Sequence, residues 1–173
     1  MVDVEHRLNV PTPVEPTTTV YAELVPPVSV SVLIAAPLDA VWEAASDLTS
    51  HPEWMADAES IRFADEQRRG VGTTMEVATR VGPFRVSDWL VVTAWEDRRL
   101  IEIVHVGSIS GWGRFRLDPL AGGIRFTWTE QLHFPWWLGG PVVAYGAQLV
   151  LSLIWRRSLA RFASRVEDSI SVR

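Results

Sequence analysis

The sequence predicts an α+β domain in which a long C-terminal helix lies across an antiparallel sheet. Segments with alternating apolar and polar residues follow one another through most of the chain, as in half-buried strands. Near the C-terminus the apolar residues recur instead at spacings of three and four, which is the pattern of one helix face. These residues are Leu151, Trp155, Leu159, Phe162 and Val166. The length of 173 residues is that of a single domain with a sizeable core.

The segment Phe134–Trp155 contains no charged residue and has two interpretations. Trp136–Trp137 at one end and Arg156–Arg157 at the other resemble the aromatic belt and positive flank of a membrane span. Alternatively, Pro141 lies in the first turn of a helix that packs on the sheet. The charge-free part of that helix would be about 22 Å long, shorter than the roughly 30 Å hydrocarbon core of a bilayer. The packed helix is therefore favoured, and membrane association stays an alternative.

Composition excludes several classes of function. The formal net charge of -5 and the lack of a basic run argue against nucleic-acid binding. The absence of cysteine excludes disulfides, thiolate metal sites and a cysteine nucleophile. All 16 basic residues are arginine, which excludes Schiff-base chemistry on lysine. Residues Met1–Arg7 include two acidic residues and no apolar run, so we expect no secretory signal and a cytoplasmic protein.

The domain is predicted to span residues 28–168. The proline-rich residues 1–27 are expected to form an extended or disordered tail, and residues 169–173 a C-terminal tail. Val28–Ile34 has the alternation of a first strand, and Pro37 then opens a helix. Ser50–Glu53 has the spacing of a capping box and predicts a second, very short helix.

The predicted sheet continues through six further segments. These are Ile61–Phe63, Thr73–Arg80, Phe84–Trp95, Leu100–Val106, Ile109–Leu117 and Ile124–Leu132. In Phe84–Trp95 and in Leu100–Val106, apolar and polar residues occur on both faces of the strand. The alternation therefore does not determine which face points inward.

The last two segments form a predicted hairpin around a turn at residues 118–123. The expected pairs are Leu117 with Ile124, Phe115 with Phe126, Gly113 with Trp128, and Gly111 with Glu130. Because glycine has no side chain, Gly111 and Gly113 should leave open volume on the inner face, as a ligand cavity requires.

Four segments carry a resemblance to a known family: Val28–Ile34, Ala36–Trp42, Asp47–Met55 and Ile124–Glu130. Over about residues 28–168 the chain resembles the START-like superfamily, also called SRPBCC, and within it the polyketide cyclase/dehydrase branch. The resemblance implies a helix-grip fold: a curved antiparallel sheet of six or seven strands around a long C-terminal helix, with two short helices after the first strand. It also implies a tunnel for lipophilic ligands. Some members cyclise or dehydrate a bound polyketide, but the superfamily has no shared catalytic motif.

Glu130 is the main catalytic candidate. It follows Phe126 and Trp128 on the predicted inner face, where an apolar environment raises a carboxyl pKa towards neutrality. Tyr145 is a second candidate, since its hydroxyl could orient a ligand carbonyl. His105 and His133 are plausible proton carriers, but surface or hydrogen-bonded roles are favoured for them, and His51 is expected to be structural.

The predicted function is binding of a hydrophobic or amphipathic small molecule, such as a lipid or polyketide, in an internal tunnel. The alternative is a cofactor-free cyclase or dehydratase that uses Glu130 as general acid/base. No cofactor and no metal site are expected, because no histidine pair has ligand spacing. Transient membrane contact through Phe134–Trp137 is a further alternative, and the oligomeric state is left open. The predicted ligand-binding residues are Trp54, Met75, Val77, Trp89, Gly111, Gly113, Trp128, Glu130, Tyr145 and Leu149.

Overall fold

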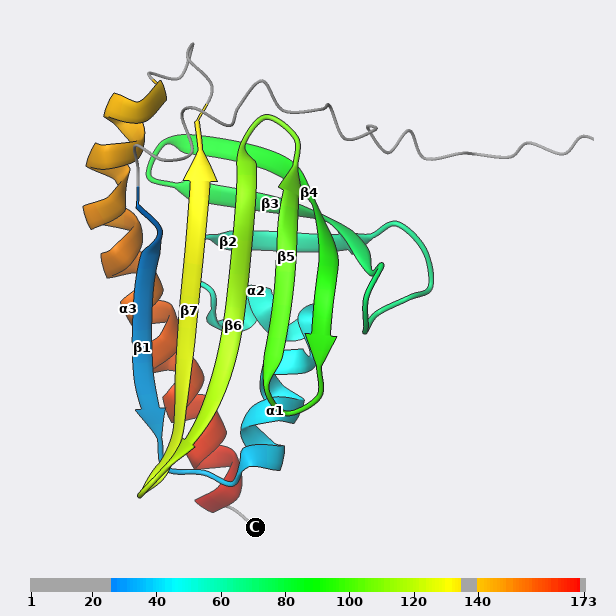
Figure 1. Ribbon diagram of the computed structural model, residues 1–173, viewed down its shortest axis with the longest axis vertical. Helices are drawn as coiled ribbons and strands as arrows, with labels where there is room; N and C mark the ends of the chain where they lie inside the picture. Colours follow the sequence, from blue (N-terminus) through cyan, green and yellow to red (C-terminus); the bar gives the residue numbers. More distant parts are fainter. Residues whose placement is uncertain (1–25, 135–139, 172–173) are drawn as a thin grey trace, which may run out of the picture.

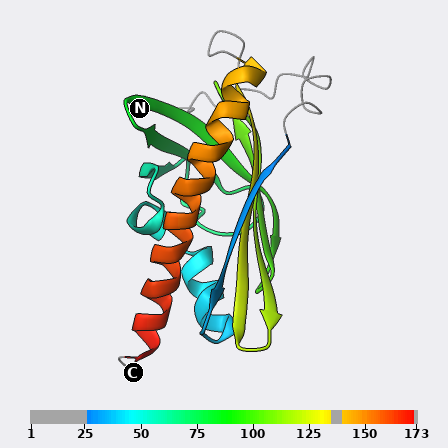
Figure 2. The same cartoon turned by 90° about the vertical axis from the view of Figure 1, so that its left-hand side faces the viewer.

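The computed structural model describes residues 26–134 and 140–171, apart from the side chains of residues 84 and 140–144. Its seven strands form one curled antiparallel sheet in the order β1-β7-β6-β5-β4-β3-β2, and the long helix α3 packs across one face of it (Figures 1 and 2). This confirms the predicted helix-grip fold. The strands are β1 (Val28–Ile34), β2 (Ala58–Phe63), β3 (Thr74–Val81), β4 (Phe84–Glu96), β5 (Leu100–Val106), β6 (Ser110–Leu120) and β7 (Gly123–His133). The helices are α1 (Leu38–Ser46), the 3-10 turn η1 (Leu48–Ser50), α2 (His51–Trp54) and α3 (Gly140–Ser171).

The first strand and helix form as their sequences predict. In β1, Val30 and Ile34 are buried while Ser29, Ser31 and Leu33 are exposed, so the alternation places one face on the core. Pro37 is the N-cap of α1, with an extended backbone that its ring favours. Val41 and Ala45, four residues apart, form the buried face of α1.

The predicted capping box at Ser50–Glu53 is wrong, although the short helix α2 is present. Ser50 has a helical backbone because η1 runs directly into α2, and its hydroxyl donates back to the carbonyl of Asp47 at 2.9 Å. Asp47 is the residue that caps: its carboxylate accepts from the backbone N–H of Thr49 at 3.2 Å. Glu53 instead pairs with Arg165 of α3.

The predicted register of the β6–β7 hairpin is wrong by two residues. Both strands extend further than expected, so that Leu120 pairs with Gly123 across a two-residue turn. Gly113 consequently lies opposite Glu130, and Gly111 opposite Leu132. Because side chains alternate with a period of two, a shift of two residues keeps every side chain on its predicted face.

The apolar stripe of α3 packs against the sheet and forms much of the core. Trp155, Leu159, Phe162 and Val166 are buried, while Leu151 is half-buried. The helix includes Pro141 in its first turn and continues to Ser171, three residues past the predicted domain end at residue 168. Within the described part of the chain, no helix combines the length and apolar character that crossing a membrane needs.

Candidate functional site

A cavity of about 890 Å³ lies between the inner face of the sheet and the N-terminal half of α3. Its wall is mostly apolar, with residues from β3, β4, β5, β6, β7 and α3. The α3 residues on the wall include Gly146, Ala147, Val150, Leu151 and Ile154. Its volume lies within the roughly 300–1,000 Å³ that small-molecule pockets occupy.

Half of the predicted ligand-binding residues lie on this cavity. They are Met75, Val77, Gly113, Trp128 and Glu130. Gly113 lines the cavity next to Glu130 but is closely packed, since a Cβ atom there would lie 3.0 Å from Cδ1 of Ile103 and 3.6 Å from the carboxyl carbon of Glu130.

Trp54 and Gly111 lie elsewhere. Trp54 is fully buried in the core, with its ring 4.9 Å from that of Phe162. Gly111 allows the close approach of β7, because a Cβ atom on it would lie only 1.9 Å from the carbonyl oxygen of Gln131. Gly111 therefore serves strand pairing, only Gly113 of the two lines the cavity, and the expected open volume at these glycines is wrong because each is closely packed.

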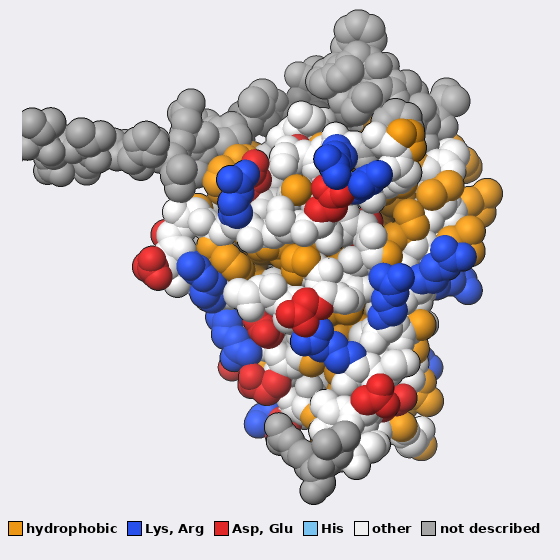
Figure 3. Space-filling view, turned by 180° about the vertical axis from the view of Figure 1, so that it is seen from behind, with side chains coloured by type: hydrophobic (Ala, Val, Ile, Leu, Met, Phe, Trp, Pro, Cys, Tyr) orange, Lys and Arg blue, Asp and Glu red, His pale blue; other side chains and the backbone are white. Residues whose placement is uncertain are grey.

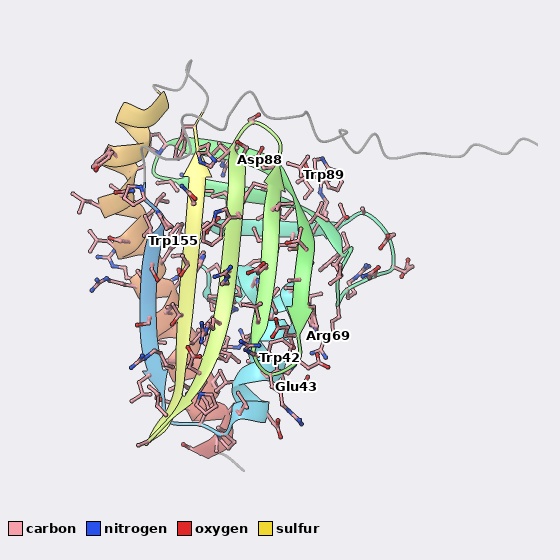
Figure 4. The ribbon with its side chains drawn as sticks, in the orientation of Figure 1. Trp42, Glu43, Arg69, Asp88, Trp89 and Trp155 are labelled. Carbon is pink, nitrogen blue, oxygen red and sulfur yellow. The ribbon has the colours of Figure 1, made fainter. Side chains whose placement is uncertain are left out.

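Trp89 lies on the other face of β4 from the cavity. Asp88 and Leu90, its neighbours in the strand, line the cavity, so alternation turns Trp89 away from it (Figure 4). This determines the inward face of β4 that sequence alternation left open. In β5 the inward residues are Ile101, Ile103 and His105.

Tyr145 and Leu149 point away from the cavity, on the exposed side of α3. Tyr145 is 60% exposed and Leu149 is 75% exposed. Hydrophobic side chains gather along the same edge of the molecule when it is seen from behind (Figure 3). Tyr145 therefore lies on a side of α3 from which its hydroxyl does not reach a ligand inside the cavity.

Glu130 is buried on β7 and faces the cavity between two polar partners. The indole N–H of Trp128 donates to its Oε2 at 2.9 Å. Nε2 of His105 lies 2.6 Å from its Oε1, an ion-pair distance when the imidazole is protonated, although the two groups are not aligned as a hydrogen bond. The structure thus gives His105 the carboxylate partner that no local sequence pattern indicated.

Asp57 is a cavity-lining residue that the sequence did not indicate. It lies between α2 and β2, where its carbonyl accepts from the N–H of Arg80 at 2.8 Å. Asp57 lines the cavity, and its carboxylate accepts from the indole N–H of Trp155 at 3.1 Å. Burial, with a smaller contribution from the negative charge of Glu130, raises the pKa of Asp57 from 3.8 to about 6.

The two indoles that hold these carboxylates are stacked on each other. The rings of Trp128 and Trp155 are 4.8 Å apart with an interplanar angle of 22°. Each donates to a different carboxylate, so the stack positions Asp57 and Glu130 together on the cavity wall. We call these two residues the carboxylate pair.

Three further polar residues contribute to the site or lie near it. Asp88 lines the cavity and accepts from the N–H of Ser108 at 2.7 Å. His51 also lines it, with Nε2 3.0 Å from the carbonyl of Ala45, and burial lowers its pKa to about 4, so its imidazole is neutral at pH 7. Desolvation also lowers the pKa of His133, which does not line the cavity.

The described residues contain no group of three histidine, aspartate or glutamate side chains arranged to hold a metal ion. Of the segment predicted to contact a membrane, Phe134 lines the cavity, and residues 135–139 lie outside the described residues.

Together, the fold and the site define a class: an α+β helix-grip protein with a ligand-sized apolar cavity between its sheet and its long helix. The model of the family "Polyketide cyclase / dehydrase and lipid transport" matches residues 26–167, and the chain belongs to that family. The predicted polyketide cyclase/dehydrase branch of the START-like superfamily is thereby confirmed. A comparison with curated proteins finds no match.

Solved structures share the fold at low sequence identity. The protein TTHA0849 from Thermus thermophilus is 19% identical with a TM-score of 0.70, over 83% of this chain and 99% of that one. The Zhui aromatase/cyclase from Streptomyces sp. R1128 is 17% identical with a TM-score of 0.68, over 84% and 96%. The di-domain aromatase/cyclase StfQ of the steffimycin biosynthetic pathway is 13% identical with a TM-score of 0.72, over 88% of this chain and 54% of that one.

Proposed function

We propose that this protein binds a hydrophobic or amphipathic small molecule, such as a lipid or a polyketide, in the cavity between its sheet and α3. The observation that carries the proposal is the cavity itself, about 890 Å³ of mostly apolar space. An apolar cavity with a few convergent polar groups is the usual form of a small-molecule site, because burial supplies affinity and the polar groups fix orientation. The family of the chain and its likeness to aromatase/cyclases support the same proposal.

Binding can be tested by filling the cavity. Val77→Trp places a bulky ring on the cavity wall in β3, whereas Val91→Trp places the same ring on the opposite face of β4. Native mass spectrometry of protein purified from a heterologous host should detect a bound lipophile in the wild type and in Val91→Trp, with at least a tenfold loss in Val77→Trp. Absence of any bound lipophile, together with no thermal shift from a panel of neutral lipids and polyketides, would count against the proposal.

A second candidate function is catalysis on the bound molecule, in the manner of a polyketide cyclase or dehydratase. The specific observation in its favour is the contact of 2.6 Å between His105 and Glu130, beside Asp57 with its raised pKa. A carboxylate and an imidazole in an apolar cavity can transfer protons near neutral pH. If the protein is an enzyme, Glu130→Gln should abolish turnover and leave ligand binding nearly intact. If Glu130→Gln reduces turnover and ligand binding equally, the role of Glu130 is in binding and not in catalysis.

A further inference from the structure

The charged groups on the cavity wall are mainly hydrogen-bond acceptors. Asp57, Asp88 and Glu130 all face the cavity. Two arginines also border it, but each is exposed and pairs with a glutamate: Arg85 with Glu59 at 3.0 Å, and Arg114 with Glu102 at 2.5 Å. Both guanidinium groups lie at the exposed margin and pair outside the cavity, with Glu59 shared between Arg85 and Arg80, so the buried charge on the wall comes from the carboxylates, with His105 beside Glu130.

The carboxylate pair has unused acceptor capacity. The indole of Trp155 binds only one oxygen of Asp57, and the other, Oδ1, is buried without a hydrogen-bond partner among the described residues. A buried acceptor without a partner is energetically costly, and most such atoms in folded proteins are satisfied by a neighbouring group, water or ligand. Asp57 lines the cavity, but Oδ1 itself has almost no exposed surface, so a ligand donor reaches it only when the side chain turns toward the bound molecule.

Building on the proposed function, we infer that the ligand presents a hydrogen-bond donor, an amine or a hydroxyl, to Asp57 and Glu130, and that the cavity discriminates against ligands ending in a carboxylate. A donor satisfies Oδ1 of Asp57, and a protonated amine also compensates the negative charge of the pair. A carboxylate would add a further anion to an apolar space in which like charges repel strongly. The cavity therefore selects amphipathic molecules by the polarity of their head group as well as by their apolar part.

The test compares three ligands with the same apolar chain: decylamine, decan-1-ol and decanoate, each below its micelle concentration, at pH 7.5. Binding is measured by isothermal titration calorimetry on the full chain. The amine and the alcohol should each bind at least tenfold more tightly than the carboxylate. Equal or tighter binding of decanoate would overturn the inference and leave a binding cavity in place. Failure of all three ligands to bind would count against the proposed function, and the inference would fall with it.

Two variants locate the selectivity at the carboxylate pair. Asp57→Asn keeps the side-chain shape and removes one negative charge, so the preference for decylamine over decanoate should shrink at least fivefold. Asp39→Asn removes the same charge from an exposed site on α1, where Asp39 pairs with Arg98, and should leave the preference unchanged. An unchanged preference in Asp57→Asn, or an equal loss in both variants, would overturn the assignment to Asp57.

Discussion

At the scale of single residues, Trp128 and Trp155 stabilise two carboxylates that are buried in an apolar space. Carboxylates are costly to bury in an apolar space, yet Asp57 is only 8% exposed and Glu130 equally so. Each carboxylate receives one indole N–H, and the indole rings present their apolar faces to each other. The stack thus supplies hydrogen bonds to the charged forms without adding a charge of its own.

We predict that Trp155→Phe raises the pKa of Asp57 above its value of about 6. Phenylalanine retains most of the packing but has no N–H donor. In the wild type the hydrogen bond from this donor favours the charged form of the Asp57 carboxyl group, so its loss raises the pKa. The free energy of unfolding at pH 7 should fall by about 1–3 kcal/mol, as for a lost hydrogen bond to a charged group. Carbon-detected NMR titration of the Asp57 carboxyl group and urea denaturation measure the two effects.

Trp112→Phe is the matched control for this prediction. Trp112 also donates through its indole, to Oε1 of Gln131 at 3.0 Å, but it lies outside the cavity wall. This variant should leave the Asp57 titration unchanged. A similar shift in both variants, or a lower pKa in Trp155→Phe, would contradict the role given to the Trp155 donor.

At the scale of elements, the part of α3 beside the cavity is less well packed than the part beyond it. Gly146 lies in that part, and a Cβ atom there would have no contact within 4 Å. Glycine in a helix interior is destabilising relative to alanine by roughly 0.5–1 kcal/mol, because it loses more backbone entropy on folding. We predict that Gly146→Ala raises the free energy of unfolding by that amount in urea denaturation.

Gly111→Ala should have the opposite effect on stability, because the backbone at position 111 requires glycine. The new Cβ would clash with the Gln131 carbonyl, and the φ of +149° disfavours any side chain. Its stability should fall by at least about 2 kcal/mol, within the range of strained backbone substitutions. Stabilisation by Gly111→Ala, or destabilisation by Gly146→Ala, would contradict these backbone roles.

Alternation predicted the elements and part of the site. Glu130 and Gly113 were placed on the inner face correctly even though the hairpin register was wrong, because a shift of two residues preserves the face. Trp89 was misplaced because both faces of β4 contain apolar residues, and its inward side is fixed only by the neighbouring strands. Tyr145 was misplaced because a helix that is apolar on several sides gives no indication of which side meets the sheet.

The polar partners in the cavity could not be predicted because they come from distant parts of the chain. Asp57 and Trp155 are 98 residues apart in sequence, and His105 and Glu130 lie on strands that are not neighbours in the sheet. No local spacing indicates such contacts. They become visible only when α3 and the curled sheet bring the residues together.

At the scale of the whole molecule, Asp57 and His51 make opposite contributions to the pH dependence of stability. The folded pKa of Asp57 is raised from 3.8 to about 6, so the folded state binds more protons and stability falls as pH rises through this window. The folded pKa of His51 is lowered from 6.5 to about 4, so the unfolded state binds more protons and stability rises through nearly the same window. Each contribution is about 3 kcal/mol, and in the wild type they nearly cancel.

We predict that Asp57→Asn exposes the contribution of His51. Without the ionisation of Asp57, the free energy of unfolding should rise by about 3 kcal/mol between pH 4 and pH 6.5, whereas that of the wild type changes little. Urea denaturation at half-unit pH intervals measures both curves. Asp118→Asn, a change of a partly exposed carboxylate on β6 that does not line the cavity, should reproduce the wild-type profile. A flat profile for Asp57→Asn would contradict the opposing contributions.

The sheet order has a consequence for how the chain folds during synthesis. Among the described strands, β1 comes first in the chain and pairs with β7 alone, so its pairing cannot be complete until Glu130 has been synthesised. The hairpins from β3 to β7 connect neighbours in sequence and can form earlier, since local contacts close at a lower entropy cost. Closure of β1 on β7 then builds the surface on which α3 packs, so the cavity is enclosed only when the last-made helix docks. Until α3 docks, the proposed binding cavity therefore lacks its wall on that side.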